Sequence, residues 1–350
     1  MGPLNDLGCL PATQDVAWVR VTEGTAAGSA RRVAGQLAER LGFPATRVAE
    51  VEIAVTEIGT NLHKHARDGA MLVRSIRAAT ESAVEIVAID SGPGMADPTW
   101  SVRDGESTAG SLGIGLGAIG RLADAHRISS RIGRGTVLTA RFHPRRGALT
   151  EISDDQPAGL TRPMTGEHVC GDAYAVRYAP DRLTMLLCDG SGHGPLAATA
   201  AQIAIRVFCG QSFATPDQAV RVLHEAMRGS RGGAVAVADL HLAAGKAVFA
   251  GLGNVSAAVV ADGQKRSMVS LPGIAGHQSR TIRAFEYPLP AGANVIMHSD
   301  GLSERWTVGG ADGVHLTDNA LVNAATLLGV AGTRTDDASV VVANVPAGTR

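Results

Sequence analysis

The stretch LLCDGSGHG, residues 186–194, decides how the second half of the chain folds. It begins as an apolar strand, and the apolar run stops at Asp189. Three glycines then surround Ser191 and His193, and glycines let a backbone approach a ligand closely. The pattern predicts a turn that something charged approaches. Taken alone, the stretch leaves open whether that is a metal, a phosphate or nothing.

The composition describes an ordinary globular protein. The chain has 350 residues, which at roughly 100–200 residues per domain favours two domains. The net charge of -1 and the aromatic content of 3% argue against a nucleic-acid surface. The N-terminus lacks the pattern of a signal peptide, and no apolar run reaches the roughly 18 residues of a membrane span. We therefore expect a cytoplasmic chain with no nucleic-acid or membrane partner.

The four cysteines form no CxxC pair, and two of them sit inside apolar stretches; they are Cys9, Cys170, Cys188 and Cys209. This usage predicts packed, reduced thiols rather than disulfides or zinc ligands.

The first half alternates helical and strand-like patterns and ends in a segment without periodicity. Helices are expected at 26–41, 46–66 and 115–124, with strands at 70–78, 83–90 and 135–142. Residues 144–162 gather Pro, Gly and charge, which predicts a linker between domains. In the second half, helices are expected at about 195–209 and 217–228, with strands at 183–189, 234–242, 246–251, 255–261, 281–287, 293–298 and 338–344.

Three elements of the first half fall in an order that suits a nucleotide. Glu57 and Asn61 lie four residues apart and so share one face of the second helix. IDSGPGM, residues 89–95, is a strand ending in a carboxylate that can accept a hydrogen bond from an exocyclic amine. STAGSLGIGLGAIGRL, residues 107–122, is a Gly-rich loop that leads into a helix, and helix N-termini bind phosphates.

Residues 15–143 resemble the GHKL ATPase fold, in particular the RsbT-type anti-sigma-factor serine kinases. The resemblance rests on TEIGTNLHKHA, DSGPGM, STAGSLGIGLGAIGRLAD and RIGRGTVLTARF. It implies that Glu57 is the general base, that Asn61 holds Mg²⁺ on the nucleotide, and that Asp90 binds adenine. The glycines that it implies around the nucleotide are Gly92, Gly94, Gly113, Gly115 and Gly117.

Further aspartates of the second half stand at strand borders, as Asp189 does. Asp172 follows a glycine, Asp300 precedes one, and Asp336 and Asp337 stand at the entrance to a strand. If these sites converge on one rim of a sheet, their repulsion requires cations, and carboxylates without His or Cys suit Mg²⁺ or Mn²⁺.

Residues 163–345 resemble the PPM-type metal-dependent protein phosphatases of the SpoIIE and RsbX branch. The matching stretches are GEHVCGDAYAV, LLCDGSGHG, FAGLGN, VIMHSDGLSE and RTDDASVVVA. The resemblance implies that Asp189 bridges two metals with the Gly190 carbonyl as a further ligand. Asp172 then contributes to one metal, and Asp300 and Asp336 hold the other.

Some roles stay open in the sequence. It does not separate Asp337 from Asp336. His193 either protonates the leaving oxygen or shapes the turn, and we favour the second. No arginine or lysine stands out as the group that binds the substrate phosphate.

These patterns predict an α/β (α+β) chain of two domains: a GHKL α/β sandwich at 1–143, a linker at 144–162, and a PPM-type αββα sandwich at 163–350. The expected cofactors are ATP with Mg²⁺ for the first and two Mn²⁺ or Mg²⁺ for the second. The resemblance implies a bifunctional regulator that phosphorylates and dephosphorylates a STAS-domain anti-anti-sigma or stressosome protein, with a sigma factor and a homodimer as further partners. The alternative is a phosphatase whose first half only senses ATP or sequesters a partner.

Overall fold

The computed structural model describes residues 9, 12–96, 115–147, 152–179, 181–279 and 281–347. The chain divides into two compact units, which are described separately below. The N-terminal unit is Thr13–Ser153, and the C-terminal unit is Asp154–Arg350 together with Cys9. No helix in the described part of the chain has both the length and the apolar character needed to cross a membrane.

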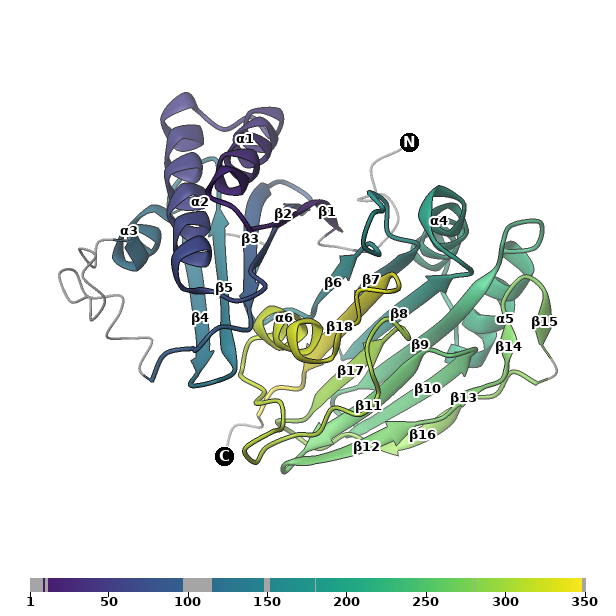
Figure 1. Ribbon diagram of the computed structural model, residues 1–350. Coiled ribbons are helices and arrows are strands. Elements are labelled where there is room, and N and C mark those ends of the chain that lie inside the picture. Colours follow the sequence, from purple (N-terminus) through teal and green to yellow (C-terminus); the bar gives the residue numbers. More distant parts are fainter. Residues whose placement is uncertain are drawn as a thin grey trace. The chain divides into compact units, whose positions relative to one another are not determined.

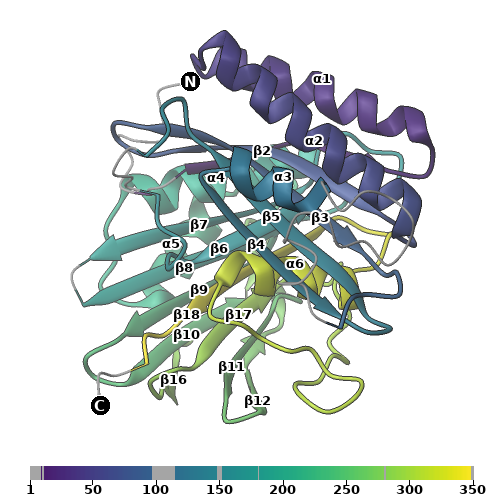
Figure 2. The same ribbon diagram turned by 90° about the vertical axis from the view of Figure 1, so that its left-hand side faces the viewer.

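The N-terminal unit is a sheet with helices packed on one face (Figures 1 and 2). Its strand order is β1–β2–β3–β5–β4. The strands are β1 (Ala12–Arg20), β2 (Ala70–Arg77), β3 (Ser82–Asp90), β4 (Ala125–Arg131) and β5 (Gly135–Phe142). The helices are α1 (Gly24–Arg40), α2 (Ala45–His65) and α3 (Gly115–Leu122).

The helices form because apolar residues recur at helical spacing and turn residues interrupt them. Gly42, at φ +79°, and Pro44 separate α1 from α2. Val55 and Ile58 of α2 are buried in the same core as Val73 of β2. Burying such side chains contributes roughly 1.5–3 kcal/mol each.

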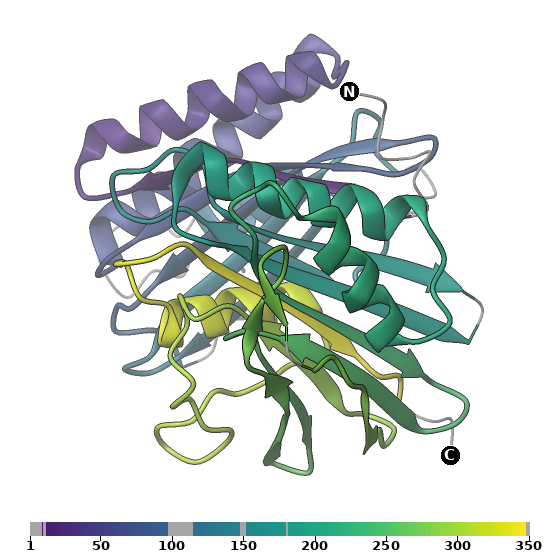
Figure 3. The same cartoon turned by 90° about the vertical axis from the view of Figure 1, so that its right-hand side faces the viewer.

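The C-terminal unit is an αββα sandwich of two sheets. The first has the order β13–β10–β9–β8–β7, with β16 beside β10, and the second has the order β12–β11–β17–β18–β6. Figure 3 shows α4 and α5, the teal and green helices, across the outer face of the first sheet, and α6 packs on β18 and β6 of the second.

The two sheets of this unit are built from the following strands and helices. The first sheet contains β7 (Asp172–Ala179), β8 (Arg182–Gly190), β9 (Gly233–His241), β10 (Lys246–Leu252), β13 (Ser270–Leu271) and β16 (Phe285–Pro288). The second contains β6 (Ala158–Arg162), β11 (Ser256–Ala261), β12 (Gln264–Met268), β17 (Asn294–His298) and β18 (Ala338–Asn344). The helices are α4 (Gly194–Gly210), α5 (Pro216–Ala226) and α6 (Ala320–Ala331), and β14 (Gly273–Ile274) pairs with β15 (Gln278–Ser279) in a short hairpin.

Three sequence expectations need correction. The segment 144–162 is not a linker throughout, because β6 forms within it and pairs with β18. The strand expected at 281–287 is the shorter β16. The cysteines are not all free thiols, because Cys9 and Cys209 form a disulfide. Their separation of 200 residues explains why spacing gave no sign of it.

Candidate functional site

An acidic cluster forms at one end of the C-terminal sandwich, where strands of both sheets finish. Asp172 opens β7 and Asp189 stands directly opposite it on β8. Met185 and Leu187 of β8 pack in the core between the two sheets, so the two-residue period turns Asp189 to the same side. From the second sheet, Asp300 follows β17, and Asp336 and Asp337 precede β18. The sequence-predicted aspartates therefore meet at one end of the sandwich.

Asp189, Asp300 and Asp336 line a cavity of about 320 Å³. Its lining combines carboxylates with small and apolar residues: Asp189, Ser191, Gly192, Ala234, Asn254, Ile274, Asp300 and Asp336. Asp172 lies beside this lining with 5% of its surface exposed. The cavity is open to solvent and acidic, which suits a cation and a small polar substrate.

The carboxylates repel one another strongly. Burial, reinforced by the charges of Asp172 and Asp300, raises the pKa of Asp189 to about 9. Burial also raises the pKa of Asp172 to about 7; the Ser299 and Ser339 hydroxyls oppose this shift. Like charges directly opposite each other on neighbouring strands destabilise a sheet. The Asp172–Asp189 pair therefore does not contribute to the stability of the fold.

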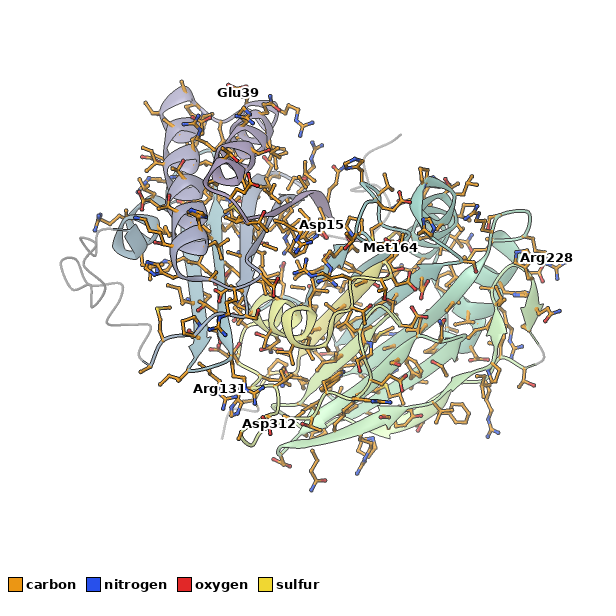
Figure 4. The ribbon with its side chains drawn as sticks, viewed as in Figure 1. Asp15, Glu39, Arg131, Met164, Arg228 and Asp312 are labelled. Atoms are coloured by element: carbon orange, nitrogen blue, oxygen red, sulfur yellow. A yellow bond between two sulfur atoms is a disulfide. The ribbon has the colours of Figure 1, made fainter. Side chains whose placement is uncertain are left out.

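Asp336 and Asp337, which the sequence could not separate, have different surroundings. Asp337 is buried, and its carboxylate accepts hydrogen bonds from the backbone N–H groups of Met164 and Gly171, both at 2.7 Å. Met164, labelled in Figure 4, belongs to the loop that leads into β7. Asp336 instead lines the cavity. Asp337 thus holds the loop before Asp172, and Asp336 faces the cavity.

Asp300 has a partner that the sequence did not suggest. The Asn254 side chain donates a hydrogen bond to the Asp300 carboxylate. Burial, together with the charge of Asp336, raises the pKa of Asp300. Asn254 ends the FAGLGN run of the sequence. Its contact with Asp300 depends on the pairing of β11 with β17, which the sequence alone does not reveal.

The donor set fits hard divalent cations. All the acidic groups are oxygen donors, and Asp172 Oδ2 is buried without a hydrogen-bond partner. Among the described residues, no three His, Cys, Asp or Glu side chains are already gathered as ligands of one ion.

Each glycine after Asp189 is required for its own steric reason. A Cβ on Gly190 would clash with the carbonyl oxygen of Ala197 in α4. Gly192 and Gly194 have φ of +84° and +74°, where side chains are strained. His193 between them bonds through Nδ1 to Glu167 Oε1 at 2.8 Å. The turn is therefore built for close backbone approach.

The candidate nucleotide site of the N-terminal unit forms where β3 ends. Asp90 accepts a hydrogen bond from the Gly92 N–H at 2.7 Å. Burial raises the pKa of Asp90, although hydrogen bonds from the backbone N–H groups of Gly92 and Thr136 act to lower it. A Cβ on Gly94, at φ +67°, would clash with the carbonyl oxygen of Arg131. A Cβ on Gly135 would clash with the carbonyl oxygen of Asp90. The sequence did not single out Gly135.

The remaining predicted residues come from α2 and α3. Glu57 and Asn61 are both half-buried on α2, and Asn61 Nδ2 is buried without a hydrogen-bond partner. Gly115 and Gly117 stand in the first turn of α3. The N–H groups of a helix's first turn have no partner within the helix and can bind phosphate oxygens. Gly113 lies outside the described residues.

Comparisons with known proteins agree with this division. Residues 21–142 match the histidine kinase-like ATPase domain family, and residues 179–346 match the family of stage II sporulation protein E (SpoIIE). The chain is 31% identical over 126 residues to the serine/threonine-protein kinase RsbT of Bacillus subtilis (strain 168), covering 36% of this chain and 95% of that protein.

Solved structures give weaker similarities. A structure described as the bacterial stressosome is 27% identical, with a TM-score of 0.49, covering 53% of this chain and 97% of its own. RsbX in complex with magnesium is 17% identical, with a TM-score of 0.46, covering 54% of this chain and 94% of its own. The serine/threonine phosphatase PstP of Mycobacterium tuberculosis is 16% identical, with a TM-score of 0.43, covering 55% of this chain and 98% of its own.

Proposed function

Because this chain belongs to the RsbT-like histidine kinase-like ATPases through its first half and to the SpoIIE phosphatases through its second, we propose that it is a bifunctional partner-switching regulator. The first half phosphorylates serine or threonine of a STAS-domain protein with ATP. The second half removes that phosphate. The observation that carries the proposal is the convergence of carboxylates from two sheets on one cavity.

The phosphatase half would hold two divalent ions, Mn²⁺ or Mg²⁺. Asp189 would bridge them, because it lines the cavity and its pKa responds to Asp172, Asp300 and Asp336. Asp172 would complete one ion, and Asp300 and Asp336 the other, with the Gly190 carbonyl as a further ligand. When bound, such ions lower the pKa of a water and neutralise charge on a phosphate ester.

The chain's own residues orient that chemistry. Asp337 fixes the loop before Asp172 through two backbone hydrogen bonds, and Asn254 orients Asp300. His193, held by Glu167, stands at the start of α4 next to the Gly192 wall of the cavity. We assign His193 to the shape of this turn, because the contact of its Nδ1 with Glu167 ties the turn to the loop before β7.

The kinase half would hold ATP with Mg²⁺ between α2, the end of β3 and the start of α3. Asn61 would hold Mg²⁺ through its amide oxygen, and its buried, unpartnered Nδ2 would donate a hydrogen bond to a phosphate oxygen. Asp90 would accept a hydrogen bond from adenine, and the α3 N-terminus would bind phosphate oxygens. Glu57 would accept the proton of the target hydroxyl, and positioning would supply most of the rate enhancement.

The proposal is tested by following phosphate on a STAS-domain partner incubated with the full chain, ATP and Mg²⁺. Asp189→Asn should let phosphate accumulate, because hydrolysis stops while transfer continues. Glu57→Gln should prevent its appearance. The matched controls are Asp181→Asn, an exposed carboxylate in the turn between β7 and β8 at the other end of β8, and Glu39→Gln, which is exposed on α1 and labelled in Figure 4.

The outcomes separate the two halves. If a pre-phosphorylated partner is still dephosphorylated by Asp189→Asn, the metal assignment is wrong. If Glu57→Gln transfers phosphate as fast as the native chain, the base assignment is wrong. If the native chain transfers none, yet a non-hydrolysable ATP analogue changes the dephosphorylation rate, the first half is an ATP-responsive switch.

A further inference from the structure

Arg231 lies in the turn between α5 and β9, beside the glycine turn that follows Asp189. A Cβ built on Gly192 would lie 3.0 Å from Arg231 Nη1. Gly192 is part of the cavity wall, together with Asp189 and Ser191. The guanidinium group therefore lies against Gly192, one of the residues that line the acidic cavity.

The side chain of Arg231 keeps its donors free. Arg231 is exposed, and within the described residues its guanidinium makes no ion pair or hydrogen bond. Nearby arginines are engaged: Arg221 pairs with Asp217 at 3.4 Å, and Arg228 pairs with Glu225 at 3.0 Å. Arg231 thus differs from its neighbours in presenting an uncommitted charge.

The backbone of Arg231, by contrast, is held firmly. Its carbonyl oxygen bonds to His277 Nε2 at 3.1 Å, which joins it to the turn between β14 and β15. The next carbonyl, that of Gly232, accepts a hydrogen bond from the Ser191 N–H at 2.9 Å. The Gly232 N–H donates to Ser230 Oγ at 3.0 Å. These contacts fix the base of the side chain relative to the Asp189 turn.

A positively charged side chain beside the cavity suits a phosphate substrate. A phosphate monoester is an anion, and it must approach a wall of aspartates that repels it wherever bound ions do not neutralise the charge. Arginine binds phosphate oxygens with two parallel hydrogen bonds, which a lysine cannot reproduce. We propose that Arg231 binds the non-bridging oxygens of the substrate phosphoryl group. This inference rests on the proposed phosphatase function and supplies the phosphate-binding residue that the sequence did not reveal.

The experiment uses the full chain with Mn²⁺ and p-nitrophenyl phosphate. Arg231→Ala should lower kcat/KM by about 10–100-fold, because charge-assisted hydrogen bonds are worth roughly 1.5–3 kcal/mol. The inhibition constant of inorganic phosphate should rise by a similar factor. Arg231→Lys should recover part of both. The affinity for Mn²⁺ should stay unchanged, since Arg231 is not a ligand.

Arg228→Ala is the matched control, and its side chain is labelled in Figure 4. It lies three residues away and should leave both constants unaltered. If the native chain hydrolyses the ester and Arg231→Ala leaves phosphate inhibition unchanged, the inference is overturned while the phosphatase stands. If Arg231→Ala weakens Mn²⁺ binding as much as activity, the residue only supports the turn, and the inference is again overturned. If the native chain shows no Mn²⁺-dependent hydrolysis, the proposed function falls and this inference with it.

Discussion

Each unit carries a carboxylate within a sheet, buried in the N-terminal unit and half-buried in the C-terminal one, and the two are surrounded differently. Glu85 of β3 is buried between two arginines on neighbouring strands: Arg74 Nε donates to it at 2.8 Å and Arg141 Nε at 2.9 Å. Asp189 of β8 stands opposite another carboxylate and near two more. Burial acts to raise the pKa of Glu85, but Arg74 and Arg141 hold this pKa below its ordinary value.

The difference separates a structural charge from a functional one. The N-terminal sheet supplies its own counter-charges, so Glu85 is compensated as soon as the unit folds. The C-terminal sheet places carboxylates together, and their compensation must come from outside the chain. Arrangements that raise a carboxylate pKa by several units are typical of active sites rather than of cores.

The largest expected effect is on the free energy of unfolding. It is seen when the same carboxylate-to-amide change is made at Glu85 and at Asp189. Glu85→Gln should lower the free energy of unfolding of the N-terminal unit by about 3–5 kcal/mol, because it removes the buried negative charge that faces both Arg74 and Arg141. Asp189→Asn should raise that of the metal-free C-terminal unit at neutral pH, because an amide is uncharged without the proton that the raised pKa makes the folded Asp189 take up. Urea denaturation followed by hydrogen exchange in each unit measures both. Equal losses at the two positions would contradict the comparison.

Metal addition should act on one unit only. At 100 times its dissociation constant, a bound ion raises the free energy of unfolding by about 2.7 kcal/mol. Thermal unfolding of the full chain with Mn²⁺ and with EDTA should show this gain in the C-terminal unit and no gain in the N-terminal unit without nucleotide. A similar gain in Asp189→Asn would mean that the ions bind elsewhere.

The two units should respond to pH in opposite directions when metal is absent. Glu85, with its lowered pKa, stabilises the N-terminal unit above the ordinary glutamate pKa of about 4.3, and this stability is lost as pH falls below it. Because the pKa of Asp189 is raised to about 9, the folded C-terminal unit holds a proton that the unfolded chain releases near pH 4. Its stability should therefore fall as pH rises from about 4 to 9. Denaturation midpoints of each unit in EDTA test this, and parallel pH profiles would refute it.

The smallest expected effect is at Asn254. Asn254→Ala removes the hydrogen bond that orients Asp300, and loss of such an outer contact typically weakens metal binding about 10-fold or more. An Mn²⁺ titration of the full chain measures it. Asn344→Ala, at the far end of β18, is the control and should bind Mn²⁺ normally. An unchanged affinity in Asn254→Ala would show that Asp300 needs no orienting partner.

Much of the fold and of the acidic cluster could be predicted because both rest on local signals. The stripe of α2 follows the helical period, and β3 and β8 are short apolar runs. The ranges of all three agree with expectation to within one residue at each end. Asp172, Asp189 and Asp300 were recognisable because each stands where a strand meets a glycine. The resemblances of the first half to histidine kinase-like ATPases and of the second half to the SpoIIE branch were confirmed by the family matches. The roles of the individual residues stay predictions.

What could not be predicted depends on contacts distant in the chain. β6 is a strand because β18 pairs with it, although its own sequence carries no period. The helix α6 was missed because it is apolar nearly all round, as fully buried helices are. The Cys9–Cys209 disulfide and the approach of Arg231 to Gly192 join segments that only the folded topology brings together.

The most direct test of the account is an equilibrium titration of the metal-free full chain with Mn²⁺, compared with Asp189→Asn and the Asp181→Asn control. The account predicts saturable binding of two ions to the native chain and to the control, and loss of that binding in Asp189→Asn. Absence of saturable binding to the native chain, or equal binding to Asp189→Asn, would contradict the claim that the aspartates of the two sheets form a cation site.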